Sequence, residues 1–328
     1  MNTREIAVTR IVKSRACALL LMIVALTATS AVAVMNPGSE TSLGVSRGLF
    51  SFNGLSDSAT VAICIGLNIL TVILMTLLNG TFNLLRTTSW LFLAMYMAMQ
   101  TATPIIMTRS VSGNILVVGI LGAIWILYSL YQNPQQTRRV FLAFFIITAL
   151  SCLHYAYLLF IPAFIAGLAQ MRALSFRSIL AAGVGIICPL WLLLAFGWID
   201  FSKSLPALGW EIPGIGFIIQ HPVLSIAVAF TILSGLVILM ANMLKVYGYN
   251  ARIRAHNGLM LLVWLCSAAL CIADFTSIWC VLPLLNCTTA FQTGLMFRIY
   301  TMKRAYVPVL IMITVYATLY ICNTVLYI

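Results

Sequence analysis

The chain has 328 residues, of which 62% are hydrophobic and 7% are charged, and its mean hydropathy is +1.08. A soluble domain cannot bury so large an apolar fraction, because too much of its chain must face water. Lipid forbids unpaired backbone groups, so we predict an all-α polytopic transmembrane bundle in a single domain, residues 1–328. The net charge of +12 is distributed between apolar runs, which indicates an orientation signal and no nucleic-acid partner.

Apolar segments follow one another along the whole chain. We predict about 11 of them, since roughly 20 apolar residues are needed to cross a bilayer as a helix. In chain order they lie at residues 17–35, 58–78, 88–107, 114–131, 140–152, 154–170, 178–197, 222–244, 258–273, 276–297 and 305–326. The first has a basic start and small residues at 30–33, as a signal peptide does. Because its apolar run continues through Met35, we predict an uncleaved signal-anchor within residues 1–35.

The stretch between Arg139 and Arg172 contains 32 residues without a formal charge when His154 is neutral. As one helix it would be about 48 Å long at roughly 1.5 Å per residue, well beyond a hydrocarbon core of about 30 Å. Polar residues beside His154 mark a bend, and Pro162 interrupts the second half. We therefore predict a hairpin of two short helices at 140–170. It should pack inside the bundle, with Pro162 against neighbouring helices, because short or broken helices need protein around their exposed backbone.

The distribution of charged residues predicts the orientation in the membrane. With a cytoplasmic N-terminus and this hairpin, 15 of the 18 Lys and Arg residues fall inside. The basic residues outside are Arg47, Arg109 and Lys203. Five of the 6 acidic residues fall outside: Glu40, Asp57, Asp200, Glu211 and Asp274. We predict a multi-pass protein of a bacterial inner membrane, with outer loops at 36–57 and 198–221 and an outward C-terminus at Ile328.

Carboxylates on the predicted outer side are the candidates for acid–base chemistry. Glu40 and Asp57 lie in the first outer loop, where either could accept a proton as a general base. The alternative is that both are ordinary solvated loop carboxylates.

Cationic and imidazole side chains on the same side are the candidates for substrate binding. Arg109 ends a segment whose polar residues 100–103 lie just below it, and its guanidinium could hold phosphate oxygens bidentately. Arg47, His221 and His154 complete the predicted substrate-binding set. The alternatives are that Arg109 anchors its helix by snorkelling and that the histidines have structural roles.

Known nucleotide, dinucleotide and paired-cysteine metal motifs are missing from the sequence, so we predict no cofactor and no metal site. The nine cysteines lie almost entirely in apolar runs, where cysteine behaves as a small hydrophobic residue. Polar residues along the tenth segment, from Asn286 to Gln292, should form hydrogen bonds between helices or line a cavity.

The hairpin and the segment after it carry a resemblance to known membrane proteins. Arg138-Arg139 precede the hairpin, the connector Arg172-Ala-Leu-Ser-Phe-Arg177 follows it, and the next segment contains Gly183, Gly185 and Pro189. Over about residues 80–200, this pattern resembles a family of bacterial polytopic inner-membrane proteins of unknown function. That resemblance implies no particular activity.

A looser likeness is to type C glycosyltransferases and polysaccharide repeat-unit polymerases, which act on polyprenyl-linked sugars at the outer face. Type C enzymes place a catalytic carboxylate in the first outer loop, the location of Glu40 and Asp57 here. This loop has only 22 residues and lacks a paired-acid motif.

Two functions therefore stay open. One is an enzyme of envelope glycan metabolism that acts on a polyprenyl-phosphate lipid. The other is a non-catalytic subunit or scaffold of an envelope assembly or secretion complex, with membrane lipids and membrane proteins as partners.

Overall fold

The computed structural model describes residues 14–35, 55–85, 90–197, 219–246, 248, 250–299 and 306–327. In these ranges the chain is helical and contains no β-strand, so the predicted all-α fold class is confirmed. Glu40 and Arg47, and residues 198–218 of the second predicted outer loop, lie outside the described residues.

The helices follow the predicted segments in order. They are α2 (Arg15–Met35), α3 (Asp57–Phe82), α4 (Leu91–Thr101), α5 (Pro104–Arg109), α6 (Val111–Tyr128), α7 (Thr137–Ser151), η1 (Tyr155–Leu159), α8 (Phe160–Gln170), α9 (Phe176–Ala195), α11 (Pro222–Val246), α12 (Ala251–Ala273), η2 (Phe275–Ser277), α13 (Ile278–Ile299) and α14 (Tyr306–Tyr327). The predicted segment at 88–107 contains two separate helices, α4 and α5.

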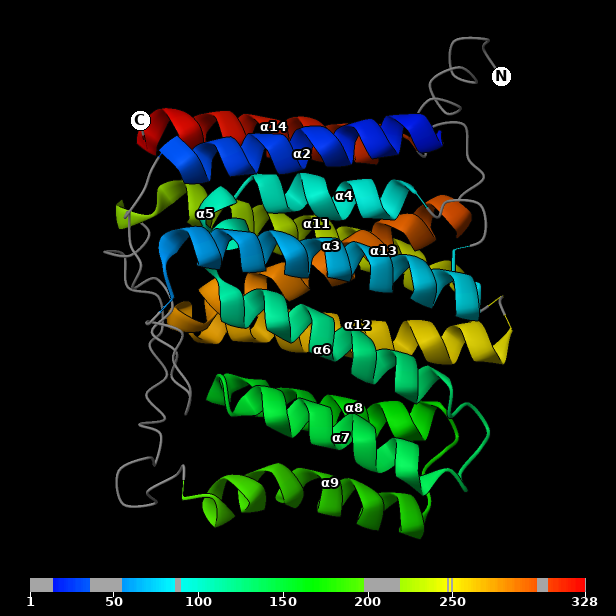
Figure 1. Cartoon of the computed structure of the whole chain (residues 1–328). Helices are drawn as coiled ribbons and strands as arrows, with labels where there is room; N and C mark the ends of the chain where they lie inside the picture. The colour runs from blue at the N-terminus through cyan, green and yellow to red at the C-terminus, as the bar shows by residue number, and fades with distance from the viewer. Residues whose placement is uncertain are drawn as a thin grey trace.

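The helices run back and forth between two ends of the bundle (Figure 1). We call one the Asp57 end; it contains Asp57, Arg109, Pro222 and Ile278. We call the other the Arg138 end; it contains Arg138, Arg172, Lys245 and Arg252. Each long helix links the two ends, which is the arrangement that a membrane-spanning bundle requires.

The hairpin is formed by α7 followed by η1 and α8. Both arms reach the Arg138 end, as Figure 1 shows, so the predicted hairpin at 140–170 is confirmed. Helix α7 packs against α6 and α9, and α8 packs against α12. The expectation that Pro162 packs against neighbouring helices is wrong, since its side chain is exposed. Pro162 lies in the first turn of α8, where a missing N–H costs little.

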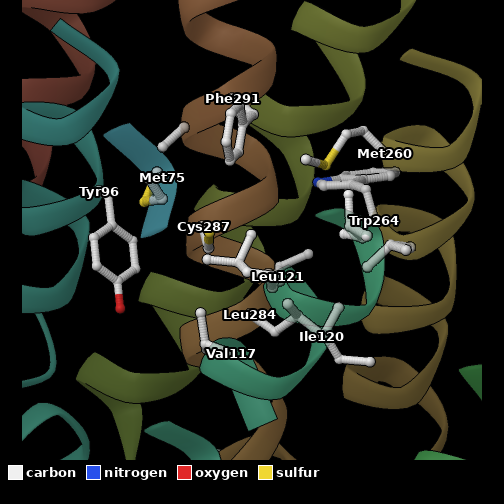
Figure 2. Packing of buried hydrophobic residues seen from close by; sticks show 14 of the residues in the cluster. Met75, Tyr96, Val117, Ile120, Leu121, Met260, Trp264, Leu284, Cys287 and Phe291 are labelled. Carbon is white, nitrogen blue, oxygen red and sulfur yellow. The ribbon is translucent and has the colours of Figure 1, made fainter. Parts of the chain in front are cut away.

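The core of the bundle is built around α13, which contacts α4, α6, α11 and α12. Figure 2 shows Leu284, Cys287 and Phe291 of α13 among side chains from α3, α4, α6 and α12. Lipid is as apolar as these side chains, so close packing and interhelical hydrogen bonds hold such helices together.

The outer surface of the bundle is suited to lipid. Seven helices of the described chain are long and apolar enough to cross a membrane: α2, α3, α6, α9, α11, α12 and α14. Large apolar side chains of α9, such as Phe176, Ile187 and Trp191, are exposed. An apolar surface of this extent is stable only in lipid or against another protein. The chain is therefore a membrane-embedded helical protein.

Candidate functional site

A cavity of about 370 Å³ lies at the Asp57 end, between the ends of α5, α11, α13 and α14. Its volume falls within the range of small-ligand sites, about 300–1,000 Å³. One part of the lining consists of apolar side chains from α5 and from the start of α11. The polar and aromatic part consists of Thr103, Gln220, His221, Trp279 and Asn323.

Thr103 reaches the cavity because the chain breaks between α4 and α5. Pro104 has no N–H and disfavours helical backbone in the residue before it. Thr103 accordingly has φ −128° and ψ 69°, while Pro104 begins α5. Helical hydrogen bonding resumes directly after the break, because the N–H of Met107 donates to the carbonyl of Thr103 at 3.1 Å.

His221 is held at the start of α11. Pro222 occupies the first helical position, where its fixed φ favours helix initiation. The His221 carbonyl accepts hydrogen bonds from the backbone N–H and the hydroxyl of Ser225, both at 3.0 Å. The imidazole meets the Trp279 ring edge to face, with 5.7 Å between the ring centroids.

Trp279 is placed by a close approach of α6 to the start of α13. The Ser110 hydroxyl donates to the Trp279 carbonyl at 2.7 Å. Gly113 allows this approach, because a Cβ on it would lie 2.8 Å from the carbonyl oxygen of Cys280. Sequence-distant helices thus fix the aromatic wall of the cavity.

Asn323 joins the cavity from the last part of α14. Its Nδ2 donates to the Ala102 carbonyl at 3.0 Å. Carbonyl groups at the end of a helix such as α4 lack intrahelical donors, so this side chain satisfies one of them.

Two cavity residues carry an oxygen without a hydrogen-bond partner among the described residues: Oγ1 of Thr103 and Oδ1 of Asn323. The side chains are only 4% and 6% exposed. An unsatisfied buried polar group costs about 1–3 kcal/mol. A ligand or water that donates a hydrogen bond here would therefore be stabilised.

Beneath the cavity, polar side chains form a hydrogen-bonded series that we call the amide chain: Asn286, Gln100, Tyr96, Asn68 and Asn114. The successive contacts are 3.3, 2.9, 3.0 and 3.2 Å long. The series crosses α13, α4, α3 and α6, so it links four helices. All five side chains are buried and uncharged. This arrangement matches the expected hydrogen bonding between helices.

The structure brings only one of the described candidate residues into the cavity, namely His221. Asp57 starts α3 and Arg109 ends α5; both are partly buried, and α3 packs against α5. His154 is buried at the hairpin tip, where its Nδ1 accepts from the Ala156 N–H at 3.3 Å. This contact caps the start of η1, and the predicted binding role of His154 stays a prediction. The catalytic role of Asp57 and the binding role of Arg109 stay predictions.

Trp279 and Asn323 were missed as cavity residues. Asn323 carried a usable signal, because an amide in an apolar helix usually faces other helices or a cavity. For Trp279, the sequence contains no signal of a cavity beyond the position of this residue near a predicted membrane boundary. Searches among protein-family models, curated proteins and solved structures give no match to this chain.

Proposed function

We propose that the chain binds an amphiphilic membrane ligand, a lipid whose polar head enters the cavity at the Asp57 end. The observation that carries this proposal is the mixed lining: apolar side chains on one part, and hydrogen-bonding groups with two unsatisfied oxygens on the other. Such a lining suits a head group that is polar where it is buried and is attached to hydrocarbon.

The surface next to the cavity supplies a place for the hydrocarbon. Ile219 lines the cavity and is 73% exposed. Ile226 and Leu233 follow at spacings of seven residues, and both are exposed. Residues seven apart lie on one face of a helix, so Ile226 and Leu233 form an exposed apolar strip on α11, which begins three residues after Ile219. An acyl or prenyl chain could lie on this strip while its head occupies the cavity.

In the cell, we propose that the Asp57 end faces the outside of a bacterial inner membrane, with Ile328 outward and the N-terminus cytoplasmic. This orientation follows from the excess of Lys and Arg predicted at the Arg138 end. A site open to the outer leaflet suits a protein of envelope lipid or polyprenyl-glycan metabolism. The likeness to type C glycosyltransferases supports the same proposal.

A catalytic role is the second candidate, favoured by the packing of α3 against α5. This contact brings together the helices that carry Asp57 and Arg109. In that case Asp57 would act as a base and Arg109 would hold a phosphate. Replacement of Asp57 by Asn would then abolish turnover of a polyprenyl-phosphate sugar without loss of lipid binding.

The binding proposal can be tested with a variant whose larger side chain fills the cavity. Val223 lines the cavity and is buried, so Val223→Phe should displace the ligand. Val237 lies on the same helix and is exposed, so Val237→Phe is the matched control. Native mass spectrometry of the purified proteins should show co-purified lipid with the unmodified chain and with Val237→Phe, but not with Val223→Phe. Equal retention of the same lipids by both variants would refute the proposal.

A further inference from the structure

We infer that the group bound in the cavity is an uncharged hydrogen-bond donor of the hydroxyl class, recognised by Asn323 and Thr103. The inference rests on the proposed function, because it concerns the chemistry of the same cavity. It differs from the sequence-based expectation of a phosphate held by cations.

The orientation of the Asn323 amide decides which partner it can take. Its Nδ2 donates to the Ala102 carbonyl at 3.0 Å. In the flipped amide, Oδ1 would face that carbonyl oxygen, and two acceptors repel each other. Oδ1 therefore stays on the other side, where it can only accept a hydrogen bond.

An acceptor without a partner selects a ligand that donates. A phosphodiester or a carboxylate offers only acceptors, so neither satisfies Oδ1 of Asn323. An ammonium group donates, but a buried cation needs a counter-charge. Among the described residues of the cavity lining there is no Asp or Glu. A hydroxyl can donate a hydrogen bond to Oδ1 of Asn323, and it needs no counter-charge because it is neutral.

The other lining groups fit a hydroxylated head group as well. The Thr103 hydroxyl can donate or accept, and Gln220 offers an amide with both capacities. Trp279 offers an apolar aromatic surface to the C–H groups between hydroxyls. The ligand that matches all of them is a polyhydroxylated group such as a sugar, either free or linked to lipid.

The experiment compares head groups on the unmodified protein, purified in a detergent without sugar, such as lauryldimethylamine oxide. Nanodiscs contain either monoglucosyl diacylglycerol, which has hydroxyl donors and no charge, or phosphatidylcholine, which has no donor. Soluble methyl glucoside forms a third arm. The thermal unfolding temperature and the bound lipid are measured in each.

We expect the glucolipid to stabilise the protein and to bind at least tenfold more tightly than phosphatidylcholine. Binding of methyl glucoside with the same affinity would support the inference and assign the ligand to soluble sugars.

Variants at Thr103 test the contact itself. Thr103→Val keeps the shape of the side chain and removes the hydroxyl, so glucolipid affinity should fall about three- to tenfold. Thr103→Ser should restore it. Thr101→Val is the matched control, because the Thr101 hydroxyl donates to its own helix at Ala98, 2.7 Å away.

The outcomes separate the two proposals. If phosphatidylcholine binds as tightly as the glucolipid while Val223→Phe abolishes both, the hydroxyl inference is wrong and the lipid-binding proposal stands. If Val223→Phe changes neither, the binding proposal fails and the inference fails with it. The head-group series needs no variant, so poor folding of Thr103→Val would not remove the test.

Discussion

Tyr96 is the middle member of the amide chain and offers the sharpest test of what holds this bundle together. Its side chain is fully buried, and Figure 2 shows it on the side of the cluster that also contains Met75. The hydroxyl donates to Oδ1 of Asn68 at 3.0 Å and accepts from Nε2 of Gln100 at 2.9 Å. Tyr96→Phe removes both bonds and leaves the ring in place.

The expected loss of stability follows from these two bonds. Hydrogen bonds between membrane helices contribute about 0.6 kcal/mol on average and about 1.7 kcal/mol at most. Two such bonds, together with polar groups left unsatisfied on Asn68 and Gln100, give an expected loss of about 1–3 kcal/mol. The free energy of unfolding would be measured by titration with sodium dodecyl sulfate in mixed micelles, monitored by circular dichroism.

The matched control is Tyr131→Phe. The Tyr131 ring lies 6.0 Å from the Arg252 guanidinium, a contact that phenylalanine retains, and its hydroxyl has no hydrogen bond to the described residues. A double variant with Asn68→Leu adds a second check, because Tyr96→Phe should cost less once its acceptor is gone. Equal unfolding midpoints for Tyr96→Phe and Tyr131→Phe would refute the role of the amide chain in stabilising the bundle.

Two further predictions concern the packing and the topology. Gly113→Ala should destabilise the protein by about 1–3 kcal/mol, because its Cβ would meet backbone atoms of Cys280. Gly122→Ala, on the same helix with nothing within 4 Å, should be neutral or slightly stabilising in the same titration. Cysteines placed at Gln136 and Leu174, in a background without native cysteines, should react with an impermeant maleimide only after the membrane is permeabilised. Reaction of one position from each side would contradict the hairpin.

The hairpin could be predicted from the sequence because it depends on local quantities. The length of the uncharged run and the basic residues at both of its ends, Arg139 and Arg172, leave few arrangements that keep positive charge on one side. The break between α4 and α5 could also be predicted from the sequence, because Pro104 disfavours helical backbone in the residue before it. The predicted segment at 88–107 is the apolar run that contains both helices, and its polar residues 100–103 lie at the break.

The cavity could not be predicted, because its walls come from parts of the chain that are far apart in sequence. Trp279 is positioned by a bond from Ser110, and Asn323 by a bond to Ala102. Periodicity shows which residues are apolar, but an almost wholly apolar helix gives a weak indication of which face meets which neighbour. Most candidates were chosen for their charge, which is conspicuous in lipid, whereas Thr103, Gln220 and Asn323 of the cavity lining carry hydroxyl and amide groups.

The helix break and the recognition chemistry proposed for the cavity have one physical origin. Pro104 ends α4 and leaves the Ala102 carbonyl at a helix terminus, where it needs a donor from elsewhere. A side chain of another helix can supply this donor where the packed bundle excludes water. Asn323 supplies the donor, and this use of its N–H group turns its oxygen into a fixed acceptor. The same break moves Thr103 out of helical geometry and into the lining. A proline in one helix and an amide in another thus suffice to produce an uncharged acceptor site at the end of an otherwise apolar bundle.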